Sequence, residues 1–137
     1  DLDPMLFGRS PRDLKTDEEK IKLYGLSKDC NTPDGKKIEI DYFISHSWLD
    51  NATVKCDRLS AFAKKFYAQH KRMPVFWFDK TCIDQMDTSN ALAVLPINIA
   101  SSRKLLILLG ETYMTRLWCI WELFTLVRIN CLDASYL

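Results

Sequence analysis

Residues 38–44 read Ile-Glu-Ile-Asp-Tyr-Phe-Ile, and this stretch decides the fold. Its apolar residues first alternate with polar ones and then run together over the last three positions, which is typical of a strand that becomes buried on both faces. Two other short apolar runs, at 74–78 and 105–109, are each stopped by a charged residue or a glycine. Their length and their content of β-branched, aromatic and leucine residues favour buried strands. The sequence therefore predicts three buried strands.

Helix signals separate these strands. Asp50 is expected to cap a helix that ends near His70, with apolar side chains at the i, i+3, i+4 and i+7 positions of one face. A second helix is expected before the third strand, interrupted at Pro96 because proline is not tolerated inside a helix. Thr115 is expected to cap a third helix. Because strands that alternate with helices form right-handed βαβ units, we predict an α/β fold of the flavodoxin-like type, with a parallel sheet in three layers.

The first 37 residues differ from the rest because they are polar and contain several prolines and glycines. Within them, Thr16 and Glu19 have the spacing of a capping box, and Gly25 can end the short helix that follows. We interpret residues 1–37 as an N-terminal extension with one short helix, and residues 38–137 as the α/β domain.

Composition and charge exclude several classes of protein. With 137 residues, of which 47% are hydrophobic and 27% charged, the chain has the size and composition of one globular domain. The formal net charge of +1 gives no field that would favour nucleic acid as a partner. Five cysteines without a C-x-x-C pair, and only two histidines, predict reduced thiols in a cytoplasmic compartment and no metal site. No apolar run approaches the roughly 20 residues that span a bilayer.

Three segments resemble the Toll/interleukin receptor (TIR) domain family. Residues 41–45 are similar to its first-strand motif, an aspartate followed by two or three apolar residues and then Ile-Ser. Residues 78–79 are similar to the end of its second strand. The third segment has the family's Y-x(4)-W-C-x-x-E-L spacing, with Tyr113, Trp118, Cys119, Glu122 and Leu123. The resemblance covers about residues 38–130, and it identifies residues 38–137 as a TIR-like domain.

The resemblance implies a domain that works by self-association or by recruiting a related domain. Domains of the family continue through two further strands, whereas this chain stops soon after its third predicted helix. We therefore expect either a domain truncated after that helix or an N-terminal extension that replaces part of the missing structure. The loop after the second strand reads Lys-Thr-Cys-Ile-Asp-Gln at 80–85, in place of the family's Arg-Asp and Pro-Gly sequences for partner contacts. The identity of the partner therefore cannot be carried over.

Some TIR-like domains cleave NAD, and the resemblance implies a catalytic glutamate on the helix between the second and third strands. Counted back from Arg103, which is similar to the family's Ser-Arg, that position falls at or near Val94, and valine cannot do the chemistry. Cleavage needs a group that stabilises oxocarbenium-like charge or handles a ribose hydroxyl. Glu111 and Glu122 are the alternative carboxylates, although a carboxylate on the helix surface, paired with a nearby arginine, also explains Glu122. No cofactor is expected, and NAD enters only as a substrate of this alternative.

Polar residues gather where the predicted strands end, which is where parallel sheets collect their functional side chains. Backbone donors near Ser45, His46 and Ser47 could hold a phosphate, and Trp48 could stack on a base, although hydroxyls that cap a helix explain the same pattern. The expected interaction surface lies on the same side and consists of His46, Trp48, Asp79, Lys80, Asp84 and Gln85.

Our leading interpretation is a TIR-like protein–protein interaction domain in cytoplasmic signalling or assembly, with a second copy or another TIR-like domain as its partner. The alternatives are an NAD-cleaving hydrolase with a non-standard catalytic carboxylate and a structural subunit of a large assembly. The valine at the expected catalytic position disfavours the enzyme.

Overall fold

The computed structural model describes residues 16–29, 34–83 and 88–134. In these ranges three strands form one parallel sheet in the order β2-β1-β3, with β1 at Ile40–His46, β2 at Phe76–Phe78 and β3 at Ser102–Leu108. The helices there are α2 (Asp17–Tyr24), α3 (Ala52–His70), α4 (Asp79–Cys82), α5 (Thr88–Ala100) and α6 (Leu117–Ala134), and a 3-10 turn, η2 (Tyr113–Thr115), precedes α6. The predicted α/β fold with a flavodoxin-like parallel sheet is confirmed.

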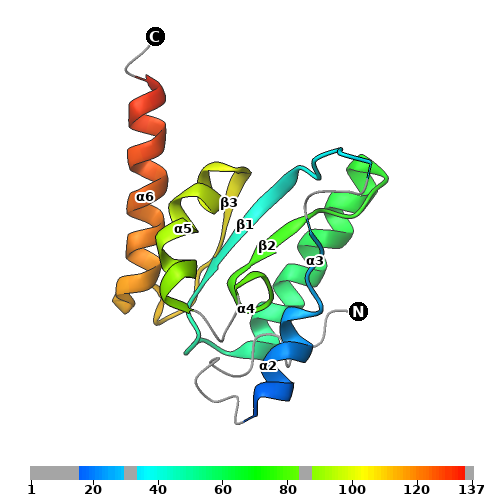
Figure 1. Ribbon diagram of the computed structural model, residues 1–137, viewed down its shortest axis with the longest axis horizontal. Coiled ribbons are helices and arrows are strands. Elements are labelled where there is room, and N and C mark those ends of the chain that lie inside the picture. Colours follow the sequence, from blue (N-terminus) through cyan, green and yellow to red (C-terminus); the bar gives the residue numbers. More distant parts are fainter. Residues whose placement is uncertain (1–15, 30–33, 84–87, 135–137) are drawn as a thin grey trace.

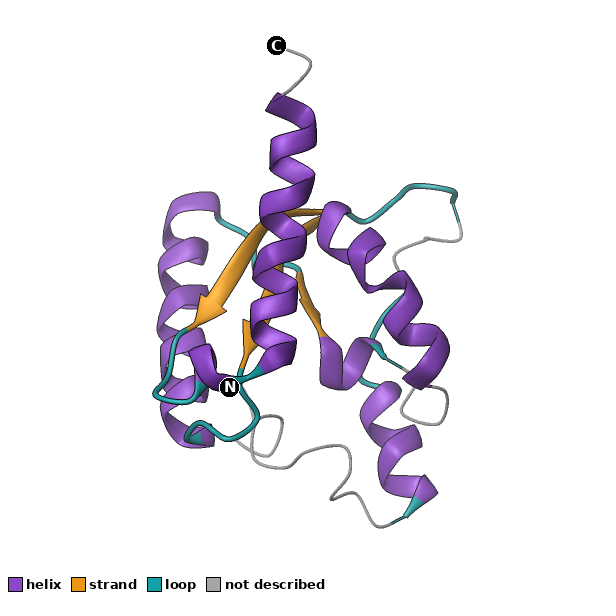
Figure 2. Ribbon diagram, turned by 90° about the vertical axis from the view of Figure 1, so that its left-hand side faces the viewer, coloured by secondary structure: helices purple, strands orange, loops and turns teal. Residues whose placement is uncertain are grey.

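The sheet lies between two layers of helices. Figure 1 shows α3 on one face and α5 with α6 on the other. Ile44 of β1 packs in a core with Leu59 of α3, whereas its neighbour Phe43 packs in a second core with Leu95 of α5. Successive residues of β1 therefore pack in two different cores. In Figure 2 the strand arrows all point to the end of the molecule where α4 lies, and the last turns of α6 extend past the opposite end.

β1 is the central strand of the sheet. Phe43 is fully buried, and its ring stacks on that of Trp77 from β2 with 4.4 Å between the ring centroids. On its other side Phe43 lies beside Leu105 of β3. Burial of a phenylalanine side chain contributes about 2 kcal/mol to stability, and a stacked aromatic pair adds about 1 kcal/mol. This contact set joins both outer strands to β1.

Asp41 is a buried carboxylate inside β1. It accepts two hydrogen bonds from the Arg72 guanidinium, at 2.6 and 2.7 Å, and one from the Val75 amide at 2.8 Å. These bonds, the Arg72 ones above all, lower the pKa of Asp41. They connect β1 to the residues that lead into β2, so they help to hold the two strands in register.

The prediction that Pro96 interrupts the second helix is wrong, because α5 continues through it. A proline inside a helix removes one backbone hydrogen bond. Leu95 and Ile99, on either side of it along the helix, are only 0% and 2% exposed. Their burial against the sheet offsets the lost hydrogen bond.

Two of the predicted helix caps are also wrong. Asn51, and not Asp50, caps α3, since its side chain accepts a hydrogen bond from the Val54 amide. Thr115 does not cap α6, because its hydroxyl donates to the carbonyl oxygen of Thr112 in the preceding turn. In both places the side chain expected to cap is engaged within the loop, and the helix begins later.

The predicted capping box of α2 is confirmed. The Thr16 hydroxyl accepts a hydrogen bond from the Glu19 amide, and the Glu19 carboxylate accepts one from the Thr16 amide. Gly25 ends this helix. No residue of α2 is buried, and the helix lies beside α4 near the carboxyl ends of the strands (Figure 1).

Candidate functional site

Polar residues from several loops and helices meet at the carboxyl ends of the strands, where ligands of parallel sheets bind. β1 ends at His46, α4 begins directly after β2, and η2 follows β3. We call this group of residues the rim. It consists of Ser45, His46, Ser47, Asp50, Lys55, Asp79, Lys80, Thr112, Tyr113, Cys119 and Glu122.

A chain of hydrogen bonds joins β1, η2 and α6 inside the rim. The Ser45 hydroxyl donates to a Glu122 carboxylate oxygen at 2.5 Å and lies 2.7 Å from the Tyr113 hydroxyl. Because the serine proton is used toward Glu122, the tyrosine hydroxyl must be the donor of the second bond. All three side chains are at most 2% exposed. The chain therefore runs from Tyr113 through Ser45 to the buried carboxyl group.

Burial changes the acidity of this cluster. It raises the pKa of Glu122 to about 8, against the hydrogen bonds from Ser45 and Trp118, which act in the opposite direction. Burial likewise raises the pKa of Tyr113 to about 12 and that of the Cys119 thiol to about 12. Near neutral pH the cluster is consequently a set of uncharged, hydrogen-bonded groups, and Glu122 is the member whose charge changes near physiological pH.

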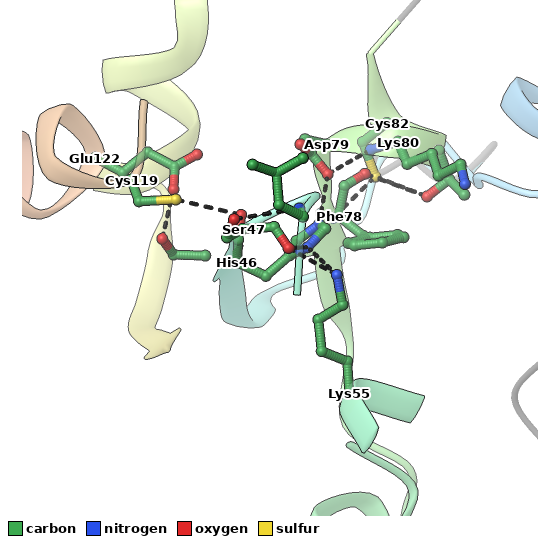
Figure 3. Close-up of polar contacts among 12 residues, drawn as sticks. His46, Ser47, Lys55, Phe78, Asp79, Lys80, Cys82, Cys119 and Glu122 are labelled. Atoms are coloured by element: carbon green, nitrogen blue, oxygen red, sulfur yellow. Dashed lines mark hydrogen bonds and ion pairs between the residues drawn. The ribbon is translucent and has the colours of Figure 1, made fainter. Parts of the chain in front are cut away.

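A second network surrounds His46. Its Nε2 lies 3.4 Å from a carboxylate oxygen of Asp79, and its Nδ1 lies 3.4 Å from Lys55 Nζ, which also donates to the Ser47 carbonyl oxygen at 2.7 Å. Nδ1 also lies 3.4 Å from the carbonyl oxygen of Ser47, so the imidazole, the Lys55 ammonium and this oxygen form one cluster of polar contacts. Burial lowers the pKa of Lys55. Figure 3 shows this network between Cys119 and Glu122 on one side and Lys80 and Cys82 on the other.

Asp79 and Lys80 begin α4. The Asp79 carboxylate accepts a hydrogen bond from the Lys80 amide at 2.7 Å, so it helps to order the chain directly after β2. Lys80 is 1% exposed, and its ammonium lies 5.4 Å from the centre of the Trp48 ring, within the range of a cation–π contact. The loops after β1 and β2 are thereby joined through buried side chains.

Asp50 connects the loop after β1 to the loop after β3. One of its carboxylate oxygens accepts hydrogen bonds from the amide and the hydroxyl of Thr112, at 2.9 and 2.8 Å. The Thr112 hydroxyl lies 2.6 Å from that of Ser47. The second oxygen of Asp50 is buried against Gly110, where any Cβ atom would overlap the carboxylate. This close approach is open only to glycine.

A pocket of about 700 Å³ lies beside the rim, between the start of α3 and the residues that follow β3. Arg58 lines it and donates a hydrogen bond to the carbonyl oxygen of Leu109 at 3.0 Å. Glu111, one of the two alternative catalytic carboxylates, lines the same pocket and is exposed. Glu111 and Glu122 therefore occupy different environments, one on the surface and one buried.

The structure places the predicted site residues differently from the expectation. His46, Asp79 and Lys80 are buried and cannot form a contact surface, because neighbouring side chains cover them. Trp48 is half-buried, and Asp84 and Gln85 lie outside the described residues. Ser45, His46 and Ser47 do lie together at the end of β1, but their side chains are used within the rim.

The interpretation of Glu122 as a carboxylate on the helix surface, paired with a nearby arginine, is wrong. Glu122 is 2% exposed and binds Ser45, because its position on α6 faces the end of β1. Lys55 is only 3% exposed, and the sequence reasoning did not place it on the buried face of α3. Its spacing of four residues from Leu59 was the signal that could have placed it on the buried face.

Several other properties bear on chemistry. Val94, at the position that the resemblance gives to a catalytic glutamate, is exposed on α5. Among the described residues, no group of three or more histidine, cysteine or acidic side chains could hold a metal ion. No helix in the same ranges has the length and apolar character to cross a membrane. The described Cys56 and Cys119 are buried, and Cys82 is half-buried.

No family model, no curated protein and no solved structure significantly matches the chain. The functional argument therefore depends on the geometry of the rim and on the surfaces that surround it.

Proposed function

We propose that the chain is a TIR-like protein–protein interaction domain, which acts in intracellular signalling or assembly by associating with a second copy or with a related domain. The observation that carries this proposal is a group of exposed apolar side chains on β3, directly after it and on α6. We call the part of this group on and directly after β3 the β3 edge, because β3 pairs with β1 alone within the described residues.

The exposed fractions of these side chains are large. Ile107 is 37% exposed and Leu109, directly after β3, is 58% exposed. On α6, Leu117, Phe124 and Val127 are 84%, 59% and 51% exposed. Single exposed apolar residues are ordinary, but several on neighbouring elements are typical of an interaction surface.

The rim supports the same proposal because its polar side chains are buried and bonded to one another. The side chains of Lys55, Lys80 and Glu122 are all at most 3% exposed and are used by partners inside the protein. Such a network orders the loops at the ends of the strands and leaves little polar surface there for a ligand. Association through β3 and α6 needs no change in this network.

Sedimentation velocity over a wide range of protein concentration tests the proposal. We expect the sedimentation coefficient to rise with concentration, and we expect Leu109→Asp and Phe124→Asp each to reduce that rise. Tyr67→Asp is the matched control, because Tyr67 is 51% exposed but lies on α3, on the other face of the sheet. A monomer at every concentration, or an equal loss in the control variant, would contradict the proposal.

A second candidate function, NAD cleavage, is favoured by the environment of Glu122. A carboxyl group with a pKa of about 8 at the carboxyl ends of parallel strands has the acidity expected of a general acid or base near neutral pH. It could handle a ribose hydroxyl while the bond to nicotinamide breaks. Its burial places this candidate second, since the substrate must displace Tyr113 or Ser45 to reach it.

Incubation of the purified chain with NAD, with nicotinamide release as the readout, tests this second candidate. Cleavage by Glu122 requires that Glu122→Gln abolish the release and that Glu111→Gln, which changes an exposed carboxylate, leave it intact. Absence of release from the unmodified chain, or equal release from both variants, would reject a role of Glu122 in catalysis.

A further inference from the structure

The buried side of α6 is polar. Of the α6 side chains that the structure describes, Cys119, Glu122 and Thr125 are 1%, 2% and 9% exposed and are the most deeply buried. Because each is three residues from the next, they line one side of the helix. The apolar side chains of α6 that pack against the second core, such as Trp121 and Leu126, are only half-buried. The deepest contacts of α6 are therefore made by a thiol, a carboxyl group and a hydroxyl group.

Two of these side chains attach α6 to the end of β1. The Glu122 carboxyl group accepts a hydrogen bond from the Ser45 hydroxyl at 2.5 Å, and the Cys119 thiol donates to the carbonyl oxygen of His46 at 3.4 Å. Figure 3 shows the two α6 side chains next to each other. The start of α6 is thus held on the sheet by hydrogen bonds, and one of these bonds involves a group whose charge can change.

The groups that interact with Glu122 come from four elements, β1, η2, α4 and α6. They are the hydroxyls of Ser45 and Tyr113, the carboxylate of Asp79, the thiol of Cys119 and the indole of Trp118. The negative charge of Asp79 raises the pKa of Glu122 further. Helix α5, which also packs against α6, carries no ionisable side chain. Every group around Glu122 is consequently neutral or negative near neutral pH.

Within the described residues, no cation pairs with Glu122. Arg116, directly before α6, is exposed. The buried Lys55 contacts His46 and donates to the carbonyl oxygen of Ser47. An ionised Glu122 would therefore be a buried charge with hydrogen-bond donors but no cation beside it, which is unfavourable compared with a carboxylate in water.

We propose that Glu122 is a proton switch for the docking of α6: the protonated carboxyl group holds the first turns of the helix against the end of β1, and loss of the proton releases them. In the released helix, water would solvate the carboxylate, and the Cys119 thiol, now 1% exposed, would become accessible. The switch does not depend on the association of the proposed function, because its parts lie inside the protein.

The direction of the switch follows from the two environments of Glu122. In the docked helix burial raises the pKa of Glu122 to about 8, whereas a solvated glutamate titrates near 4.5. Docking is complete below the lower pKa and is weakened as the pH rises toward the higher one. Between these values the ratio of released to docked helix should rise by about tenfold for each pH unit, because release is coupled to the loss of one proton.

Alkylation of Cys119 by iodoacetamide, located by mass spectrometry at a series of pH values, tests the switch. Each rate is divided by the rate for the same cysteine in the urea-unfolded chain at that pH, which corrects for thiolate formation. The normalised rate should rise by about a hundredfold from pH 6 to pH 8 and level off above. Glu122→Gln should remove this rise, because an amide does not titrate. A flat profile in the unmodified chain, or an equally steep one in Glu122→Gln, would overturn the switch.

Cys56 is an internal control in the same experiment, because it is 4% exposed but lies on α3, in the core on the other face of the sheet. Release of α6 alone should alkylate Cys119 at least about tenfold faster than Cys56 after normalisation, whereas global unfolding exposes both thiols together. Equal normalised rates at every pH would overturn a local release of α6. This comparison uses the unmodified chain, so it does not require that Glu122→Gln folds.

Discussion

The rim and the β3 edge lie at neighbouring places on one sheet and have opposite properties. At the rim, charged and hydroxyl side chains such as Lys55 and Ser45 are buried and joined to partners within the protein. At the β3 edge, apolar side chains such as Leu109 are exposed, and no strand covers the backbone within the described part of the chain. A buried polar group and a large exposed apolar patch are both informative, whereas a single exposed apolar side chain is ordinary.

This contrast shows that a buried polar group and an exposed apolar group carry different information about function. A buried polar network is costly unless it is satisfied, so a closed network such as the rim is explained by the order that it gives to the loops. An exposed apolar edge gains nothing for the isolated protein and can be explained by a partner. The polar residues drew attention in the sequence, but the apolar edge is the better candidate for contact.

The largest effect expected at the rim is a dependence of stability on pH. The folded protein holds a proton on Glu122 up to about pH 8, whereas an unfolded chain releases it near the ordinary pKa of 4.5. The stabilisation is complete below the ordinary pKa and is lost as the pH rises toward the folded pKa. The free energy of unfolding should therefore fall by about 3 kcal/mol between about pH 5 and about pH 8.

Urea unfolding at a series of pH values measures this effect, with Glu122→Gln as the comparison. The variant should show a much flatter pH profile, whatever its stability at the lowest pH. Tyr113 and Cys119 have pKa values of about 12, above the range of the experiment, and Lys55 is present in both proteins. Parallel profiles for the two proteins would show that Glu122 does not titrate as the structure implies.

Ser45→Ala should have the next largest effect. It removes the hydroxyl that serves both Glu122 and Tyr113, so two buried polar groups lose a partner, at a cost of about 2–3 kcal/mol in the free energy of unfolding. Ser60→Ala, at a half-buried site on α3, is the control and should change stability by less than about 0.5 kcal/mol. Equal effects of the two substitutions would remove the distinction between a closed rim and an ordinary surface.

Gly110→Ala should have the smallest of the three effects, and it sharpens the comparison because Gly110 lies where the rim meets the β3 edge. The new Cβ would overlap the Asp50 carboxylate, which must move away from Thr112. Thermal and urea unfolding should show a loss of about 1–2 kcal/mol. Gly25→Ala is the control, since Gly25 has helical backbone angles and more space; a loss as large there would refute the explanation.

Much of the fold follows from local patterns in the sequence. Short apolar runs marked the three strands, and the alternation of strands with helices led to the parallel sheet, which the order β2-β1-β3 confirms. Pro96 was misplaced because tertiary burial of Leu95 and Ile99 overrides the local preference of proline. The cap at Asp50 was misplaced because its partner, Thr112, is distant in sequence.

The candidate site was less predictable for the same reason. Parallel topology correctly placed Ser45, His46 and Asp79 at the same end of the sheet. Which of these side chains is exposed depends on packing between elements, and the sequence contains no local signal for the bond between Ser45 and Glu122, 77 residues apart.

Amide hydrogen exchange at low and high protein concentration tests the central claim most directly. If the chain associates through the exposed apolar side chains of β3 and α6, the amides of these two elements should become more protected as the concentration rises, while those of β1, which is already central, should not change. Protection of β3 that is independent of concentration, in a chain whose rim exchanges as slowly as its core, would contradict association through this edge.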